Sequence, residues 1–91
     1  MKIIIREAQK SDMPAVISLI KELAEFEKEP DEVEIDSTIL VNDGFEENSY
    51  FKCFIAENNE CIIGAAIIYN RYSTWKGRTI HLEDLIVTEK M

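Results

Sequence analysis

The sequence predicts one α+β domain with the element order β-α-α-β-β-β. Two observations predict this class. Apolar residues in the first third of the chain recur with a helical period, whereas the residues after position 50 are rich in the aromatic and β-branched types that favour strands. Ninety-one residues make one domain at most, and no Gly-, Pro- or Ser-rich linker divides them, so residues 1–91 are treated as one unit.

The opening residues predict a short strand followed by an amphipathic helix. Residues 2–6 contain three consecutive isoleucines and no breaker. Ser11 can cap a helix, and Pro14 is tolerated in its first turn. The helix is predicted to end at or before Glu29, because Pro30 disfavours a helical residue before it. Its expected buried face consists of Met13, Val16, Ile17, Ile20, Leu23 and Ala24.

A second, shorter helix is predicted after a polar loop over residues 29–34. Asp36 or Ser37 can cap its first turn. Gly44 is the residue type that commonly follows the last helical position, so the helix is expected to stop there.

The remaining residues predict three antiparallel strands over 50–57, 61–72 and 78–87. Asn58-Asn59 suits a tight hairpin turn between the first two, and 73–77 forms the second connection. The last strand should be buried on both faces, because apolar residues surround its acidic pair.

The two cysteines are predicted to stay reduced. With the hairpin turn at Asn58-Asn59, Cys61 would lie opposite Ala56, and Cys53 would not face it. The start of the chain has too short an apolar run for a signal peptide, so cytoplasmic thiols and a cytoplasmic location are expected.

The charge of −8, from 10 basic and 18 acidic residues, disfavours nucleic acid as a partner. It favours attraction of small cations such as polyamines, although acidity that serves only solubility explains the same composition. No run approaches the roughly 18 apolar residues that span a bilayer, so no membrane partner is expected. No Cys/His cluster has metal-ligand spacing, and no Ser lies in a nucleophile elbow.

The acidic pair Glu83-Asp84 is the strongest candidate for chemistry. A carboxylate on a largely apolar strand is unfavourable unless it has a partner or a function. Glu83 has two interpretations from the residues alone: a functional group, or a member of a salt bridge with Arg71 or Arg78.

Four segments in this order resemble the GCN5-related N-acetyltransferases, specifically their diamine (spermidine/spermine or thialysine) branch. They are Leu19-Ile20-Lys21-Glu22-Leu23-Ala24-Glu25-Phe26-Glu27, Asp43-Gly44-Phe45, Trp75-Lys76-Gly77 and Leu82-Glu83-Asp84. The resemblance covers essentially the whole chain and implies the N-terminal half of that fold, ending in an antiparallel meander.

The resemblance also implies residue roles. Glu83 would be the carboxylate that holds and deprotonates an incoming primary amine. Phe26, Glu27, Trp75 and Asp84 would contact that amine, and the backbone of Leu85, Ile86 and Val87 would meet the pantetheine arm of acetyl-CoA. Relatives often have Tyr where Phe26 stands. His81 is expected to be structural.

In the family, a Gly-rich loop after this region holds the pyrophosphate of acetyl-CoA. The three glycines of this chain form no such loop, so the 91 residues alone are expected to be inactive. The open edge of the last strand predicts a homodimer or a strand-paired oligomer. The alternative function is a non-enzymatic acidic binding or assembly module that uses this edge.

Overall fold

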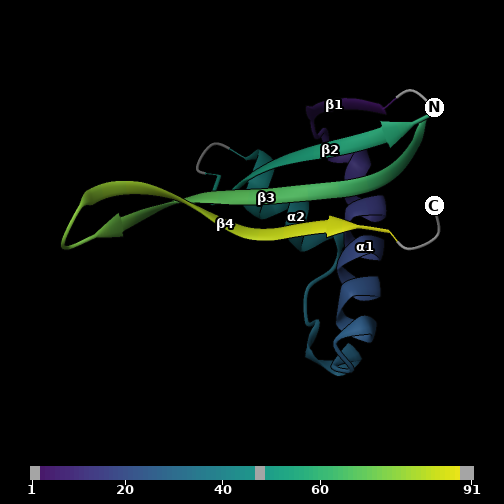
Figure 1. The fold of residues 1–91 in the computed structure, drawn as a ribbon, viewed down its shortest axis with the longest axis horizontal. Coiled ribbons are helices and arrows are strands. Elements are labelled where there is room, and N and C mark those ends of the chain that lie inside the picture. Colours follow the sequence, from purple (N-terminus) through teal and green to yellow (C-terminus); the bar gives the residue numbers. More distant parts are fainter. Residues whose placement is uncertain (1–2, 47–48, 89–91) are drawn as a thin grey trace.

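The computed structural model describes residues 3–46 and 49–88 and confirms the predicted α+β class and element order (Figure 1). The main elements are β1 (Ile3–Glu7), α1 (Met13–Phe26), α2 (Ser37–Phe45), β2 (Lys52–Asn58), β3 (Cys61–Ser73) and β4 (Gly77–Val87). Short 3-10 turns, η1 (Lys10–Asp12) and η2 (Pro30–Glu32), precede the two helices. Lys2, predicted to begin the first strand, lies outside the described residues.

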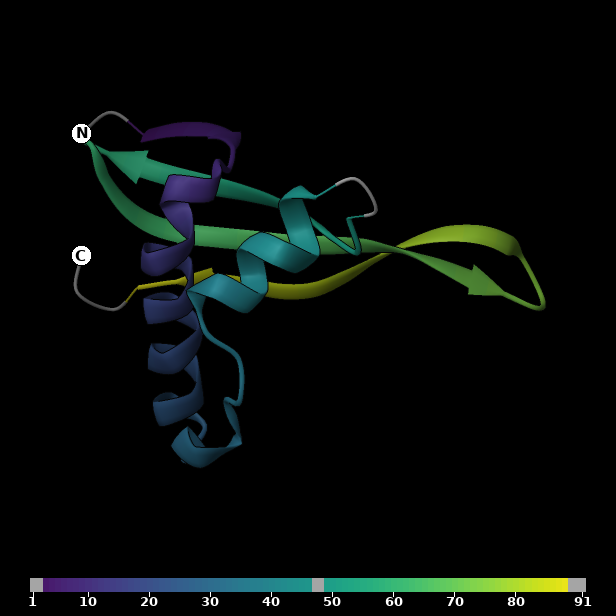
Figure 2. The same cartoon turned by 180° about the vertical axis from the view of Figure 1, so that it is seen from behind.

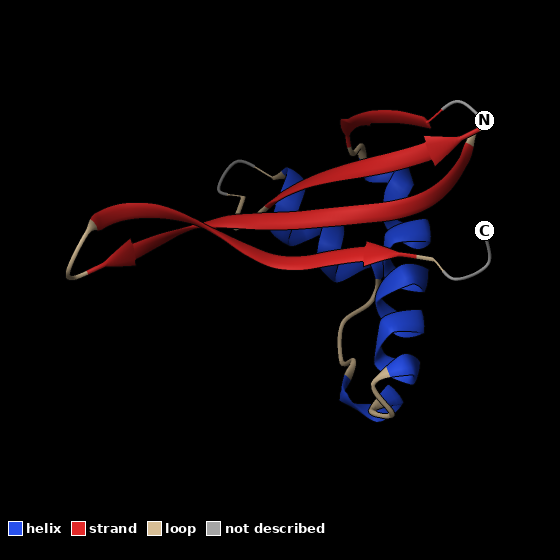
Figure 3. Ribbon diagram, viewed as in Figure 1, coloured by secondary structure: helices blue, strands red, loops and turns tan. Residues whose placement is uncertain are grey.

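The four strands form one antiparallel sheet in the order β1-β2-β3-β4. Both helices lie against the same face of this sheet, which Figure 2 shows from the helix side and Figure 3 by element type. We call the other side, which no described helix covers, the open face. The distal part of the β3–β4 hairpin extends beyond both helices (Figures 1 and 2).

The core lies between α1, α2 and the helix-side face of the sheet. Met13, Val16 and Ile55 are its most completely buried large side chains. The predicted helix face is largely confirmed: Met13 and Val16 are buried, and other members of that face pack against the core. The buried cluster consists of Ala8, Met13, Val16, Leu19, Leu40, Cys53, Ile55, Ala65, Ile67 and Ile86.

The prediction that the last strand is buried on both faces is wrong for the described residues. β4 is an edge strand, and only its helix-side residue Ile86 is fully buried, at 3% exposure. Its open-face residues Leu85 and Val87 are 69% and 65% exposed. An apolar run indicates that both faces can be covered, but it does not identify what covers them.

The start of α1 differs from the prediction, because Asp12 rather than Ser11 occupies the N-cap position. The Asp12 carboxylate accepts a 2.7 Å hydrogen bond from the Gln9 backbone N–H and two hydrogen bonds from the Arg6 guanidinium. Arg6 also donates to Glu57 on β2 at 3.1 Å. This ion-paired group joins β1, β2 and the start of α1, and it explains how an almost fully buried carboxylate is accommodated.

We expect this group to make the fold sensitive to acid. The hydrogen bonds from Arg6 hold the pKa of the Asp12 carboxyl below its ordinary value. Asp12 therefore contributes fully to stability above the unfolded pKa of about 3.9, and that contribution is lost as the pH falls through the lower folded pKa. In urea unfolding at neutral pH, Arg6→Gln should have a lower free energy of unfolding than the natural chain. This difference should shrink as the pH falls through the folded pKa of Asp12.

Lys10→Gln is the matched control for that series. Lys10 approaches Glu46 at 3.9 Å, and both side chains are exposed, so removing this pair should change stability little. If the loss of unfolding free energy in Arg6→Gln were just as large at the lowest pH, this would contradict the role given to Asp12.

The second helix starts as predicted but extends past Gly44. The Asp36 carboxylate caps it by accepting a 2.9 Å hydrogen bond from the Ile39 N–H. Gly44 does not stop the helix, which ends at Phe45. Gly44 instead provides space, because a Cβ placed on it would overlap Cζ of the Phe51 ring.

Gly44→Ala should therefore destabilise the fold, although alanine is the better helix former by about 1 kcal/mol. The added methyl would have to displace the Phe51 ring, and overpacking of this kind typically costs about 1–3 kcal/mol. Urea unfolding measures the change. In a Phe51→Leu background the same substitution should cost less, and a stabilised Gly44→Ala protein would refute the packing argument.

The first hairpin turn lies one residue beyond the predicted Asn58-Asn59. Asn59 and Glu60 form it, with φ of 51° and 66°, and Cys61 pairs with Asn58 rather than Ala56. Asn59 is a residue type that tolerates positive φ and so indicates a turn, whereas the residue type of Glu60 does not indicate one. The prediction that the cysteines do not pair is confirmed: both are free, and burial raises the pKa of the Cys53 thiol to about 11.

Within residues 3–46 and 49–88, no helix is long and apolar enough to cross a membrane.

Candidate active site

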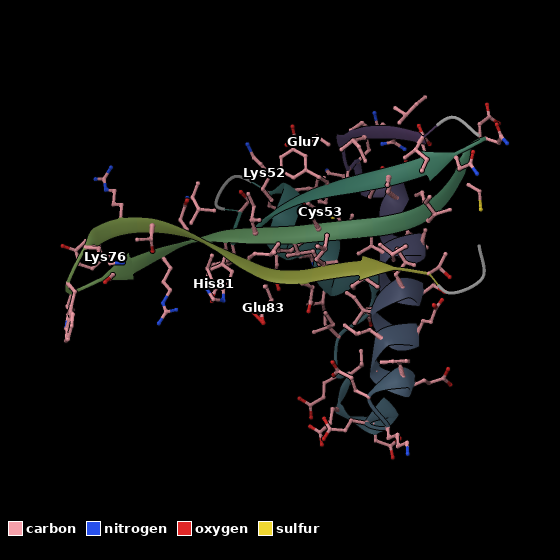
Figure 4. All side chains as sticks on the ribbon, in the orientation of Figure 1. Glu7, Lys52, Cys53, Lys76, His81 and Glu83 are labelled. Atoms are coloured by element: carbon pink, nitrogen blue, oxygen red, sulfur yellow. The ribbon has the colours of Figure 1, made fainter. Side chains whose placement is uncertain are left out.

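A β-bulge in β4 sets the direction of Glu83. Asp84 pairs with Ile67 and Leu82 pairs with Ile68, so Glu83 is an extra residue without a cross-strand partner on β3. The Glu83 side chain is exposed and projects from β4 on the side away from β3 (Figure 4). Bulges often re-aim a side chain beside a functional site, and this one directs a carboxylate off the free edge of the sheet.

Asp84 lies next to Glu83 but on the helix-side face, where it shares a cross-strand position with buried Ile67. Burial, and then the negative charges of Glu83 and Glu27, raise the pKa of the Asp84 carboxyl above its ordinary value. The fold thus brings Glu83 and Glu27 close enough to act on the Asp84 carboxyl. A cation placed among them would relieve this repulsion.

Glu27 and Phe26 reach this region from the end of α1. Phe26 is the last helical residue and is 69% exposed, and Glu27 is the C-cap, with its N–H bonded to the Leu23 carbonyl at 3.0 Å. The helix C-terminus carries partial negative charge, which adds to the field of the carboxylates. The carboxylates and the C-terminus of α1 therefore each favour a cationic ligand here.

A hollow of about 190 Å³ separates the last turns of α1 from the end of β4. It brings Phe26 together with Leu85, Ile86 and Val87, the strand residues for which the family resemblance implies contact with the pantetheine arm. A 2.8 Å hydrogen bond from the Thr88 hydroxyl to the Glu22 carboxylate joins the two elements beside it. The lining residues are Glu22, Leu23, Phe26, Leu85, Ile86 and Val87.

The structure does not bring Trp75 to this region. Trp75 lies in the turn at the far end of the β3–β4 hairpin and is 94% exposed. From Gly77 to Glu83, β4 advances by six residues, which corresponds to roughly 20 Å at about 3.3 Å per residue. Glu83, Asp84, Glu27 and Phe26 therefore form one group, and Trp75 lies outside it.

The salt-bridge interpretation of Glu83 finds no counterpart among the described residues, whose ion pairs join Arg6 to Asp12 and Glu57 and Lys10 to Glu46. His81 contacts the Tyr69 ring at a centroid distance of 5.0 Å. In the described part of the chain, no group of three or more His, Cys, Asp or Glu residues is placed to hold a metal ion.

Glu22 and Leu23 also line the hollow, although neither was predicted as a site residue. A usable signal existed, because Glu22 and Phe26 are spaced i, i+4 and so share one helix surface. The bulge at Glu83 had no such signal, since it depends on the register between β3 and β4.

Sequence comparison relates the chain to amine acetyltransferases, although no family model matches it. It is 42% identical over 93 aligned positions to thialysine N-epsilon-acetyltransferase of Bos taurus and equally so to that of Sus scrofa. It is 39% identical over 92 positions to human spermidine/spermine N(1)-acetyltransferase-like protein 1. These matches use 93% of this chain but 55% of each thialysine enzyme and 13% of the human protein.

Solved structures show the same fold at low sequence identity. An aminoglycoside acetyltransferase from an uncultured soil metagenomic sample superposes with a TM-score of 0.69 and 20% identity, covering 96% of this chain and 57% of that one. A possible acetyltransferase from Clostridium difficile 630 gives a TM-score of 0.69 and 20% identity over 98% of this chain and 59% of the other. The chain thus spans a little over half the length of these proteins.

Proposed function

We infer an amine acetyltransferase function for this chain, which belongs to the thialysine and spermidine/spermine acetyltransferase-like branch of the GCN5-related N-acetyltransferases. The proposed reaction transfers an acetyl group from acetyl-CoA to a primary amine of a polyamine or lysine-like substrate. The observation that carries this proposal is the Asp84 carboxyl, whose pKa is raised by burial and by the negative charges of Glu83 and Glu27, beside the exposed Phe26 ring.

The three carboxylates address the main chemical obstacle to the reaction. A primary amine with a pKa of about 10.4 arrives as an ammonium ion and has no lone pair for attack. We propose that Glu27 and Asp84 bind this ammonium ion and that Glu83 accepts a proton from it, directly or through water. The freed amine nitrogen then forms a bond to the acetyl carbon, the thioester C–S bond breaks, and the CoA thiolate takes up a proton.

Acetyl-CoA would meet the other side of the same region. In the described residues β4 pairs only with β3, so its far edge presents backbone N–H and C=O groups. We propose that the backbone of Leu85, Ile86 and Val87 holds the pantetheine arm there. The thioester would then lie at the end of the strand segment that carries Glu83.

The activity is proposed for a protein that extends this chain to the length of its relatives. The chain spans 55% of the thialysine acetyltransferases that it matches. Its glycines, Gly44, Gly64 and Gly77, lie far apart in the sequence and form no pyrophosphate-binding loop. We therefore expect the 91 residues alone to show no turnover.

The direct test is acetyl transfer by the extended protein. Thiol release from acetyl-CoA is followed with spermidine and with thialysine as separate acceptors. We expect release that depends on the amine, together with the mass of the N-acetylated product. Thiol release that stays at the rate of spontaneous hydrolysis with both amines and with other primary amines would overturn the proposal.

The open edge of β4 supports a second candidate, a non-enzymatic module that pairs with another strand. Leu82, Leu85 and Val87 are at least half exposed beside this edge, an arrangement that favours strand addition. In that case the β4 amides should be protected from hydrogen exchange in a concentration-dependent way. Protection that is the same in dilute and concentrated protein would remove this candidate and its strand-paired dimer.

A further inference from the structure

Thr88 fastens the end of β4 both to the sheet and to α1. Its backbone N–H donates a 2.9 Å hydrogen bond to the Ile63 carbonyl, one residue beyond Val87, where β4 ends. Its hydroxyl donates a 2.8 Å hydrogen bond to the carboxylate of Glu22, which precedes it by 66 positions in the chain. Because a β-branched side chain is restricted at χ1, the direction of this hydroxyl follows the backbone closely.

The Thr88–Glu22 hydrogen bond lies at the edge of the sheet. The last turns of α1 extend past β4, which is an edge strand (Figures 1 and 2). A hydrogen bond that a carboxylate accepts is about twice as strong as one between neutral groups. Its loss should therefore allow the end of β4 and the last turns of α1 to move relative to each other.

The same hydrogen bond borders the hollow of about 190 Å³ between these two elements. Glu22 lines this hollow, and Thr88 directly follows the residues that form its strand wall, Leu85, Ile86 and Val87. Most of the lining side chains are apolar, and a mostly apolar hollow beside a free strand edge suits a ligand that combines methylene groups with amides. The pantetheine arm has this composition.

We propose that Glu22 and Thr88 are positioning residues for acetyl-CoA. Their hydrogen bond holds the end of β4 against α1 and so fixes the width of the hollow, although neither residue takes part in proton transfer. This inference rests on the proposed function, which assigns the pantetheine arm to Leu85, Ile86 and Val87. A displacement of about 1 Å at such a place can lower the rate about 10²-fold.

Thr88→Val tests this role, because valine keeps the shape of the side chain and removes the hydroxyl. In the extended protein, the dissociation constant of CoA measured by calorimetry and the KM for acetyl-CoA should both rise about tenfold, as expected for the loss of one hydrogen bond to a charged group. With both substrates saturating, kcat should change by less than about twofold. Thr88→Ser keeps the hydroxyl and should restore most of the affinity.

Thr79→Val is the matched control. It makes the same substitution on β4 and also removes a hydrogen bond, the one that the Thr79 hydroxyl donates to the Arg71 carbonyl at 3.0 Å. Thr79 lies in the distal part of the hairpin and does not line the hollow, so the constants for CoA and acetyl-CoA should not change.

A double-mutant cycle tests whether the two residues act through one contact. Glu22→Ala should raise the CoA dissociation constant about as much as Thr88→Val, and the double variant should show no further rise, because each substitution removes the same hydrogen bond. Glu25→Ala removes an exposed carboxylate of the same helix and should have no effect. Effects that multiply in the double variant would contradict the proposal.

Hydrogen exchange of the 91-residue chain gives a measurement that needs no cofactor. The Thr88 amide should exchange faster in Glu22→Ala than in the natural chain, whereas the amide of Ile55 in the buried part of the sheet should be unaffected. Exchange of Thr88 that does not respond to Glu22→Ala would overturn the proposal.

The binding result separates this inference from the proposed function. If the extended protein binds CoA, and Thr88→Val and Glu22→Ala bind it equally well, the positioning role is overturned and the proposed function stands. If the extended natural protein binds neither CoA nor acetyl-CoA, the proposed function fails, and the positioning role fails with it.

Discussion

Replacing Glu83 with Gln should lower kcat/KM for the amine by about 10²- to 10⁴-fold in the extended enzyme, the range that general-base catalysis contributes. The substitution keeps the shape of the side chain and its place in the bulge, but an amide cannot accept the proton of the ammonium ion. The measurement is the initial rate of thiol release at several amine concentrations near neutral pH. Most of the loss should appear in kcat, because Glu27 and Asp84 remain to bind the cation.

Two further variants calibrate this result. Asp84→Asn should mainly raise KM, because Asp84 is proposed to bind the ammonium ion rather than to take its proton. Glu60→Gln removes one carboxylate at the exposed hairpin turn and should leave both constants unchanged. Unaltered kcat/KM in Glu83→Gln would eliminate Glu83 as the base.

The second large effect is on stability, and it contrasts two neighbouring residues of β4. Ile86→Ala should lower the free energy of unfolding by about 2–5 kcal/mol, the usual range for truncating a core isoleucine, because Ile86 is only 3% exposed. Leu85→Ala, at 69% exposure on the open face, should change it by less than about 0.5 kcal/mol. Urea unfolding of the 91-residue chain measures both.

The contrast tests whether the open face is free in this chain. If Leu85→Ala destabilises the fold as much as Ile86→Ala, a further polypeptide must cover the open face. The protein would then have a second core there, in addition to the helix-side core. The same pair measured in the extended protein shows whether residues beyond this chain provide such a cover.

Local patterns predicted the elements of this fold well. The helical spacing of Met13 and Val16 placed the buried face of α1, and Asp36 marked the start of α2. These features depend on residues within one or two turns of each other, so the sequence records them directly.

Features that depend on distant partners were not predictable in the same way. Asp12 precedes α1 in place of Ser11, because residues 10–12 form a 3-10 turn, and its carboxylate accepts hydrogen bonds from Arg6 on β1 and from Gln9. Gly44 stayed inside α2 because the Phe51 ring packs against it. At Gly44 the residue's own propensity was overruled by a tertiary contact.

The candidate site shows the same division. The Leu82-Glu83-Asp84 motif and the helix end at Phe26-Glu27 were recognisable from sequence, and the fold brings Asp84 near Glu27. The bulge that separates the directions of Glu83 and Asp84 depends on the pairing of β3 with β4. The distance between Trp75 and the carboxylates depends on this pairing as well.

The central claim, that these carboxylates bind a protonated amine, is tested most directly by the carboxyl NMR signals of the labelled 91-residue chain during titration with spermidine. Burial and like charges raise the pKa of Asp84 in the free protein. A bound ammonium ion favours the ionised carboxylate, so saturation should lower this pKa and shift the Glu83 signal, and Glu27→Gln should weaken the response. An Asp84 titration curve that spermidine leaves unchanged would contradict the claim.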